Sequence, residues 1–194
     1  MTLHCEVNVN FCIFPGTFNP IHEAHLCIAN YALQKFKFDK IIFIPAYIPP
    51  HKEIKKNIAL HRFKMVQLAT AYNPRFEVSD IEFNAEEKSY TLNTVKKIKE
   101  IYKINDKVNM IIGTDAFSNI KSWYKADELK EHVHFIVFPR GVDINVNDFK
   151  DYDYELTTMK YIPISSTELR NGKFRDKINN EVREYIKQND LYEY

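Results

Sequence analysis

The chain has 194 residues, of which 45% are hydrophobic and 27% are charged, and its formal net charge is +1 at pH 7. This length suffices for one domain with a sizeable core, and the small net charge excludes a general electrostatic attraction to nucleic acid or to an anionic membrane surface. No apolar run approaches the roughly 20 residues of a membrane span, and the first residues lack the features of a signal peptide, so we expect a soluble protein with no nucleic-acid or membrane partner.

The three cysteines form neither a disulfide nor a metal-binding pattern. They are Cys5, Cys12 and Cys27, an odd set without a C-x-x-C pair. Cys12 and Cys27 fall in apolar-periodic segments, which indicates buried thiols. We therefore expect a reducing compartment and a cytoplasmic protein.

The first predicted unit is a strand, a loop and a helix. The apolar run "FCIF" at 11–14 ends at Pro15-Gly16, and Asn19-Pro20 forms a turn that starts a helix at about Ile21. "KIIFIPA" at 40–46 then predicts a strand buried on both faces, as in a parallel sheet.

Strands and helices continue to alternate after this unit. Apolar stripes predict helices at 63–72 and 92–102, with a strand candidate at 76–83 between them. Apolar runs at 108–113 and 134–138 predict two more buried strands. This alternation predicts an α/β fold, a doubly wound (Rossmann-like) parallel sheet with helices on both faces, whose ligands lie beyond the carboxyl ends of the strands.

The rest of the chain adds no second domain. The stretch from about 141 to 160 is acidic, rich in Asn and Asp and without clear periodicity, which indicates a polar surface excursion. The segment 180–194 predicts a short amphipathic helix that packs on the sheet. We expect one domain covering 1–194.

The stretch "FPGTFNPIHEAHL" at 14–26 combines features that a fold alone does not require. Gly16 follows the strand and lets a ligand approach the backbone closely. The start of the next helix offers unpaired N–H groups and a partial positive charge, to which a phosphate binds readily. His22 and His25, on the same face of the first turn, would place two imidazole donors beside one anion.

Two other interpretations of this stretch are a plain loop with two surface histidines and a zinc site. The zinc-protease signature needs histidines four residues apart and a third ligand elsewhere. Here the interval is three, and no nearby carboxylate or cysteine cluster completes a tetrahedron. The spacing therefore disfavours zinc.

A second phosphate-binding pattern lies in "ISSTELR" at 164–170. Ser165 with Glu168 fits a capping box, which by itself predicts only the start of a helix. Arg170 lies one turn into that helix, beneath Ser166 and Thr167, and hydroxyls with a guanidinium make a second anion cradle. Two such cradles on one sheet suit a polyphosphate.

The paired stretches "GTFNPIHEAH" and "ISSTELR" resemble the two signatures of the nucleotidylyltransferase superfamily. Within it, "IPPHK" at 48–52, "SYTLNTV" at 89–95 and "IIGTDAFSNIKSWY" at 111–124 are similar to segments of the bacterial-type nicotinate-mononucleotide adenylyltransferases, in the same order. The resemblance spans nearly the whole chain.

This resemblance implies transfer of an adenylyl group from ATP to nicotinate mononucleotide, which gives deamido-NAD and pyrophosphate. It implies direct attack of the mononucleotide phosphate on the α-phosphorus, with Mg²⁺ carried on ATP, no metal ligand from the protein and no covalent enzyme intermediate. The alternatives are the same chemistry on nicotinamide mononucleotide or phosphopantetheine, or a nucleotide-binding protein that senses ATP or NAD without catalysis. The oligomeric state, a homo-oligomer included, is left open.

The resemblance also implies roles for individual residues. His22 and His25 would act catalytically on the α and β phosphate oxygens, and Arg170 would hold the leaving pyrophosphate. The residues that would bind ATP are Gly16, Thr17, Phe18, Gly113, Asp115, Ser166 and Thr167. Those that would bind the mononucleotide are Lys52, Tyr90, Thr91 and Trp123. Without these roles, Asp115 would be a helix N-cap and Trp123 a core residue.

The chain departs from the family pattern at a few positions. Pro15 and Ala24 stand where glycines are usual, and Asn19 stands where an acidic residue is often found. None of these changes removes a phosphate donor. Ala24 adds a methyl group, whose effect on the ATP affinity is left open. The order Pro-Arg-Gly at 139–141, in place of Arg-Pro-Gly, leaves the contact of Arg140 open.

Overall fold

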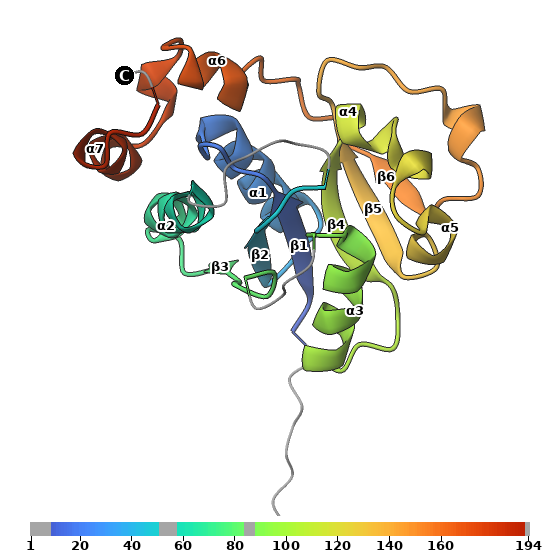
Figure 1. Ribbon diagram of the computed structural model, residues 1–194. Coiled ribbons are helices and arrows are strands. Elements are labelled where there is room, and N and C mark those ends of the chain that lie inside the picture. Colours follow the sequence, from blue (N-terminus) through green and yellow to red (C-terminus); the bar gives the residue numbers. More distant parts are fainter. Residues whose placement is uncertain (1–8, 51–57, 84–87, 193–194) are drawn as a thin grey trace, which may run out of the picture.

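The structure is a computed structural model that describes residues 9–50, 58–83 and 88–192. At its centre lies a six-stranded sheet in the order β3-β2-β1-β4-β5-β6, in which every neighbouring pair is parallel (Figure 1). The strands are β1 (Phe11–Gly16), β2 (Lys40–Pro45), β3 (Phe76–Val78), β4 (Val108–Gly113), β5 (Val133–Phe138) and β6 (Tyr154–Leu156). This order is that of doubly wound dinucleotide-binding folds, so the predicted fold class is confirmed.

Helices cover both faces of the sheet. The α-helices are α1 (Glu23–Lys35), α2 (Ile58–Thr70), α3 (Thr91–Ile101), α4 (Thr114–Phe117), α5 (Ala126–Leu129), α6 (Ser166–Arg170) and α7 (Asn180–Gln188). The described residues also form short 3-10 helices, namely η1 (Ile120–Ser122), η2 (Val146–Phe149) and η3 (Arg175–Lys177). Within the described ranges, none of the helices has the length and apolar character needed to cross a bilayer.

The core has two halves because successive strand residues point to opposite faces of the sheet. In β1, Cys12 and Phe14 belong to the half that α1, α2 and α7 cover. Phe11 and Ile13 belong to the other half, which α3 and α4 cover. A strand buried on both faces carries apolar residues at every position, which is why the central strands read as continuous apolar runs.

Two predicted elements differ in extent or packing. The strand predicted at 76–83 is only β3, because the chain turns after it, where the backbone N–H of Phe83 donates to the carbonyl of Asp80. The last helix packs mainly against α2, and its buried face joins the core cluster on that side of the sheet (Figure 1). There the Tyr185 hydroxyl lies 2.9 Å from Nδ1 of His61 in α2.

The stretch predicted as a polar excursion at about 141–160 is mostly exposed but is not irregular. It contains η2 and the edge strand β6, which pairs with β5. Phe149 and Tyr152 are buried against the Phe117 ring. A strand of three residues gives no detectable period-2 pattern, so the sequence did not predict the sixth strand.

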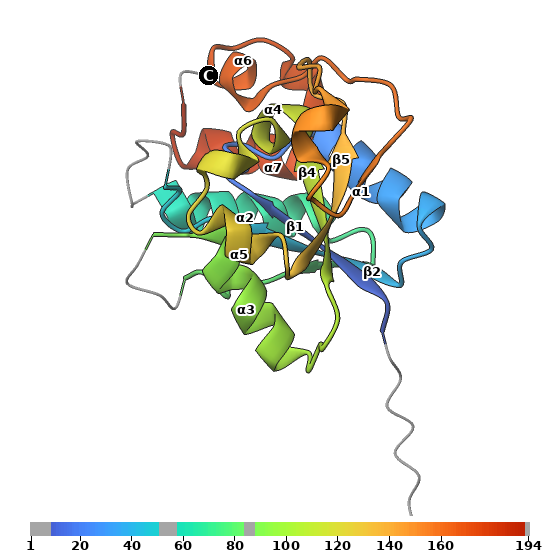
Figure 2. The same cartoon turned by 90° about the vertical axis from the view of Figure 1, so that its right-hand side faces the viewer.

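The carboxyl ends of the strands face one end of the molecule. The strand order reverses between β1 and β4, which pair at Cys12–Asn109 and Ile13–Met110. In open parallel sheets the crevice at this reversal is where ligands bind. In two perpendicular views, α6 and α4 lie at this same end of the sheet (Figure 1 and Figure 2).

Candidate active site

A cleft of about 1380 Å³ lies over the carboxyl ends of β1 and β4. Most of the predicted site residues line it, although they come from four separate stretches of sequence. They are Gly16, Thr17, Phe18, His25, Tyr90, Thr91, Gly113, Asp115, Trp123, Ser166, Thr167 and Arg170. Lys52, also predicted, lies outside the described residues.

The histidine pair marks the start of α1. His22 is the N-cap residue, and its backbone N–H donates to Nδ1 of His25 at 3.2 Å. This bond makes Nδ1 of His25 an acceptor, so a neutral His25 carries its proton on Nε2. His25 therefore has the tautomer that can donate from Nε2, and its ring lines the cleft.

His22 is buried behind His25 and does not line the large cleft in the described part of the chain. Its ring lies 3.8 Å from the His25 ring, centroid to centroid, and the residue is only 2% exposed. Neither ring nitrogen has a hydrogen-bond partner among the described residues. Burial, and secondarily the positive charge of Arg140, lower the pKa of His22 from 6.5 to about 3, so the ring is neutral at physiological pH.

The alternative interpretation of two surface histidines is wrong, because His22 and His25 are 2% and 6% exposed. His25 lines the cleft, whereas His22 lines a cavity of about 10 Å³ beside Ile164. That both rings flank the same anion stays a prediction.

The loop between β1 and α1 is tightly folded. Phe18 has a φ of +47°, a left-handed conformation that bulky residues rarely adopt. Its ring packs on Phe14 and Phe43 and leaves the residue 3% exposed. A Cβ on Gly16 would lie 2.7 Å from that ring. The Phe18 side chain therefore belongs to the core, and any contact with ATP would come from its backbone.

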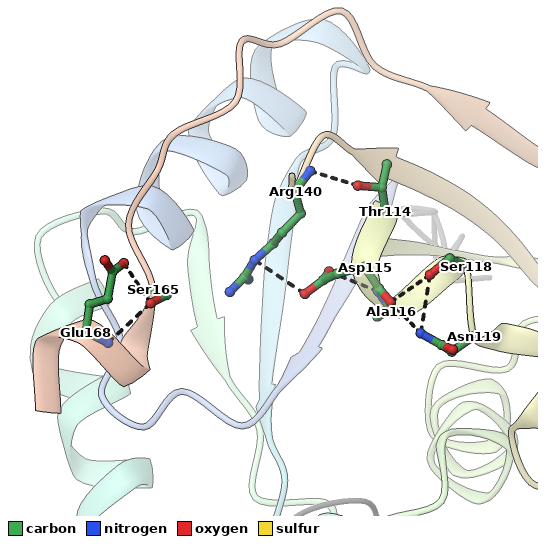
Figure 3. Close-up of polar contacts among 8 residues, drawn as sticks. All are labelled: Thr114, Asp115, Ala116, Ser118, Asn119, Arg140, Ser165 and Glu168. Atoms are coloured by element: carbon green, nitrogen blue, oxygen red, sulfur yellow. Dashed lines mark hydrogen bonds and ion pairs between the residues drawn. The ribbon is translucent and has the colours of Figure 1, made fainter. Parts of the chain in front are cut away.

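The second predicted cradle lies directly against this loop. Ser165 is the N-cap of α6, and its Oγ accepts from the backbone N–H of Glu168 at 3.2 Å, so the predicted helix start is confirmed (Figure 3). The Ser166 hydroxyl donates to the carbonyl of Pro20 at 2.9 Å. Arg170 donates to the carbonyl of Asn19 at 2.7 Å. The structure thus brings the two cradles together.

A third group of residues closes the cleft at the end of β4. Gly113 is the N-cap of α4, so Asp115 lies in the first turn and is not the N-cap. The Asp115 carboxylate accepts from the backbone N–H of Ala116 at 2.9 Å and pairs with Nε of Arg140 at 3.7 Å (Figure 3). A Cβ on Gly113 would lie 2.5 Å from Oδ1 of Asp115 and 3.0 Å from Cδ of Arg140. Only a glycine allows this close packing.

Aromatic side chains also line the cleft. Tyr90 is the N-cap of α3, and its ring stacks on Tyr124 at 4.4 Å between centroids. Trp123 is partly buried and lines the cleft, so it is not an enclosed core residue. A flat aromatic wall of this kind suits a planar ring as ligand.

Sequence reasoning missed two buried charged residues next to the cleft. Arg62 is 0% exposed, and its guanidinium donates to the carbonyls of Thr17 and Tyr47. Glu82 is 7% exposed, and its Oε1 accepts from the Thr94 hydroxyl at 2.6 Å. Arg62 could have been found, because it shares the apolar helical stripe of Met65, and an arginine in such a stripe is unusual.

No protein metal site is evident in the described residues. No group of three or more His, Cys, Asp or Glu side chains within 9–50, 58–83 and 88–192 could hold a metal ion. Asp115, the acidic residue that lines the cleft near Gly113, is paired with Arg140.

Comparisons of sequence relate the chain to known proteins. The sequence model of the family described as cytidylyltransferase-like matches residues 13–172. The nicotinate-nucleotide adenylyltransferase of Bacillus subtilis is 36% identical over 189 residues, which cover 93% of this chain and 97% of that one. A protein of Dictyoglomus turgidum named "Probable nicotinate-nucleotide adenylyltransferase" is 37% identical over 191 residues, which cover 93% of this chain and 94% of that one.

A solved structure with the same fold is the Plasmodium falciparum nicotinic acid mononucleotide adenylyltransferase complexed with NaAD. It matches with a TM-score of 0.81 at 23% identity, and the match covers 94% of this chain and 97% of that one. This likeness agrees with the doubly wound fold described above.

Proposed function

The chain belongs to the cytidylyltransferase-like family and, within it, to the nicotinate-nucleotide adenylyltransferases, and we propose that it joins ATP and nicotinate mononucleotide in the cleft over β1 and β4. The products are deamido-NAD and pyrophosphate. The reaction belongs to NAD biosynthesis.

The observation that carries the proposal is that one cleft is lined by two different kinds of chemistry. His25, Ser166, Thr167 and Arg170 supply phosphate-binding groups. Tyr90 and Trp123 supply aromatic rings. Such a cleft suits a ligand pair that carries both a triphosphate and a pyridine ring.

In the proposed reaction, an oxygen of the mononucleotide phosphate attacks the α-phosphorus of ATP in line with the leaving group. The new phosphorus–oxygen bond forms while the bond from the α-phosphorus to the bridging oxygen of the β-phosphate breaks. Pyrophosphate leaves with that electron pair. The attacking phosphate is already an anion at neutral pH, so the reaction needs no protein nucleophile and no carboxylate base.

Catalysis then depends on alignment and on charge stabilisation. His25 would donate from Nε2 to an α-phosphate oxygen, while Arg170, Ser166 and Thr167 would bind the β and γ phosphates. Gly113 and Asp115 would take the ATP ribose. Alignment of two bound reactants lowers the activation free energy by roughly 7 to 11 kcal/mol, and one well-placed donor lowers it by about 2.7 to 4 kcal/mol. These two contributions are large enough for catalysis without a protein nucleophile or base.

His22 has a different place in this mechanism from His25. Because it is neutral and buried, it would act on the phosphates only through one N–H donor, or by holding the His25 ring in place. On the nicotinate side, Tyr90 and Thr91 would meet the carboxylate, Trp123 would stack on the pyridine ring, and Lys52 would face phosphate.

Magnesium enters this proposal with ATP. The described residues offer no carboxylate cluster that fits a resident metal ion. Mg²⁺ binds oxygens of nucleotide phosphates together with water, and there it offsets phosphate charge.

The test is product formation from purified protein, ATP and Mg²⁺ with nicotinate mononucleotide in one tube and nicotinamide mononucleotide in another. Preference for the acid supports the nicotinate assignment, whereas equal use of the amide would refute that specificity and keep the chemistry. Product from neither would move the assignment to phosphopantetheine as acceptor, or to a sensor without catalysis.

A further inference from the structure

Arg62 ties together two loops that follow the neighbouring strands β1 and β2. It lies in α2 and is fully buried, and it is not among the described residues that line the cleft. Its Nη1 donates to the carbonyl of Thr17 at 2.8 Å and its Nη2 donates to the carbonyl of Tyr47 at 3.1 Å. Thr17 follows β1 and Tyr47 follows β2, so one guanidinium joins the ends of two neighbouring strands.

The side chain is charged although it is buried. Burial lowers the pKa of Arg62 to about 10, which leaves the guanidinium protonated at neutral pH. The nearby Glu82 carboxyl is itself buried, and burial raises its pKa while hydrogen bonds and the charge of Arg62 oppose that rise. Burying a charge costs free energy that an apolar residue at this helical position would avoid.

The first loop needs such support. Phe18 holds a left-handed φ of +47°, and a strained residue persists only where its surroundings fix it on both sides. Arg62 holds the carbonyl before it, at Thr17, and Arg170 holds the carbonyl after it, at Asn19.

The second loop leads to the aromatic side chains of the cleft. Tyr47 precedes Ile48, whose backbone N–H donates to Oγ of Ser89 at 3.1 Å and whose carbonyl accepts from the Ser89 N–H at 2.9 Å. Ser89 is followed by Tyr90 and Thr91, which line the cleft. The contact at Tyr47 therefore reaches the mononucleotide side.

We propose that Arg62 is a positioning residue that sets the distance between the ATP loop at 16–19 and the mononucleotide loops at 47–48 and 89–91. The proposal rests on the proposed function, since it assigns one substrate to each loop. Arg62 touches neither substrate and acts through the backbone of Thr17 and Tyr47.

The test compares Arg62→Lys with Val66→Ala. Lysine keeps the positive charge but lacks the two-pronged donor that spans both carbonyls. Val66 lies one turn further along α2 and is fully buried, so its truncation removes core packing and no loop hydrogen bond. For each protein we would measure kcat and the dissociation constants of a non-hydrolysable ATP analogue, nicotinate mononucleotide and deamido-NAD.

The expected result is specific to ligands that span both loops. In Arg62→Lys, kcat falls by about 10- to 100-fold, since a misplacement of about 1 Å can cost that much. The dissociation constant of deamido-NAD rises by about tenfold more than the product of the rises measured for the ATP analogue and for nicotinate mononucleotide. We call this the excess loss. Val66→Ala lowers the melting temperature and leaves this excess loss at zero.

Three results would overturn the proposal. The first is an active Arg62→Lys variant with no excess loss. The second is the same excess loss in Val66→Ala. The third is that neither Arg62→Lys nor Arg62→Gln, the latter measured in the cold, folds while Val66→Ala does, because Arg62 would then be a purely structural residue. A parent protein that makes no deamido-NAD would instead refute the proposed function.

Discussion

The Arg170 guanidinium donates a 2.7 Å hydrogen bond to the carbonyl of Asn19, which lies 151 residues earlier in the chain. A second bond, from the Ser166 hydroxyl to the Pro20 carbonyl, lies beside it. These two bonds hold α6 against the loop that follows β1. The two sequence patterns that predict phosphate binding therefore lie side by side at the same cleft.

Replacing His25 by alanine should lower turnover far more than it weakens ATP binding. The imidazole would donate to charge that develops only in the transition state, and loss of one such donor costs about 10²- to 10³-fold in kcat. Steady-state kinetics with a separate measurement of ATP affinity would check this. Turnover equal to that of the parent would refute the proposed role.

Replacing Trp123 by alanine should weaken the mononucleotide and spare ATP. Stacking of one base on an aromatic ring is worth about 1–3 kcal/mol, so we expect the KM for nicotinate mononucleotide to rise by about tenfold. Trp123→Phe, which keeps a flat ring, is the control and should recover most of the loss. An unchanged KM in Trp123→Ala would return the residue to a packing role.

Replacing Gly113 by alanine should weaken ATP binding. The new Cβ would lie 2.5 Å from the Asp115 carboxylate, which must move away from the position proposed for the ribose contact. We expect the KM for ATP to rise by about tenfold, equivalent to about 1.4 kcal/mol, with little change for the mononucleotide. A wild-type KM for ATP would show that Asp115 does not bind ATP from its present position.

His22 should make the protein sensitive to acid. Its pKa is about 3 in the folded state against 6.5 ordinarily, so between these values the unfolded chain binds a proton that the folded chain does not. Stability is therefore fully present above pH 6.5 and is lost as the pH falls toward 3, with a slope of up to about 1.4 kcal/mol per pH unit.

Urea unfolding of the parent and of His22→Asn across this pH range would measure the effect. Titrating groups distant from His22 have the same surroundings in both proteins and cancel in the comparison. The stability of the variant should fall less steeply on acidification. Parallel curves would contradict the lowered pKa of His22.

The sequence predicted the separate segments of the site better than the way in which these segments pack together. Strand, loop and helix signals around Gly16 depend on local spacing, so they could be read directly, as could the Ser165 cap of α6. That α6 lies against Asn19 depends on contacts between distant segments, which local patterns do not encode. The burial of His22 was missed for the same reason, since neighbouring segments such as 159–164 cover it.

The sequence also did not predict which polar side chains are buried. Arg62 looks like a surface residue by its type, and only its place on the apolar face of α2 sets it apart. Its two partners are backbone carbonyls, which no residue pattern marks.

β6 was missed because three residues at a sheet edge carry no periodic signal.

The most direct test of the central claim follows the phosphorus atoms of ATP. Purified protein, Mg²⁺ and nicotinate mononucleotide would be incubated with ATP labelled at either the α- or the γ-phosphate. The account predicts that α-label enters deamido-NAD and γ-label is released in pyrophosphate, in equal amounts. Release of orthophosphate without dinucleotide, or γ-label in the nucleotide product, would contradict adenylyl transfer.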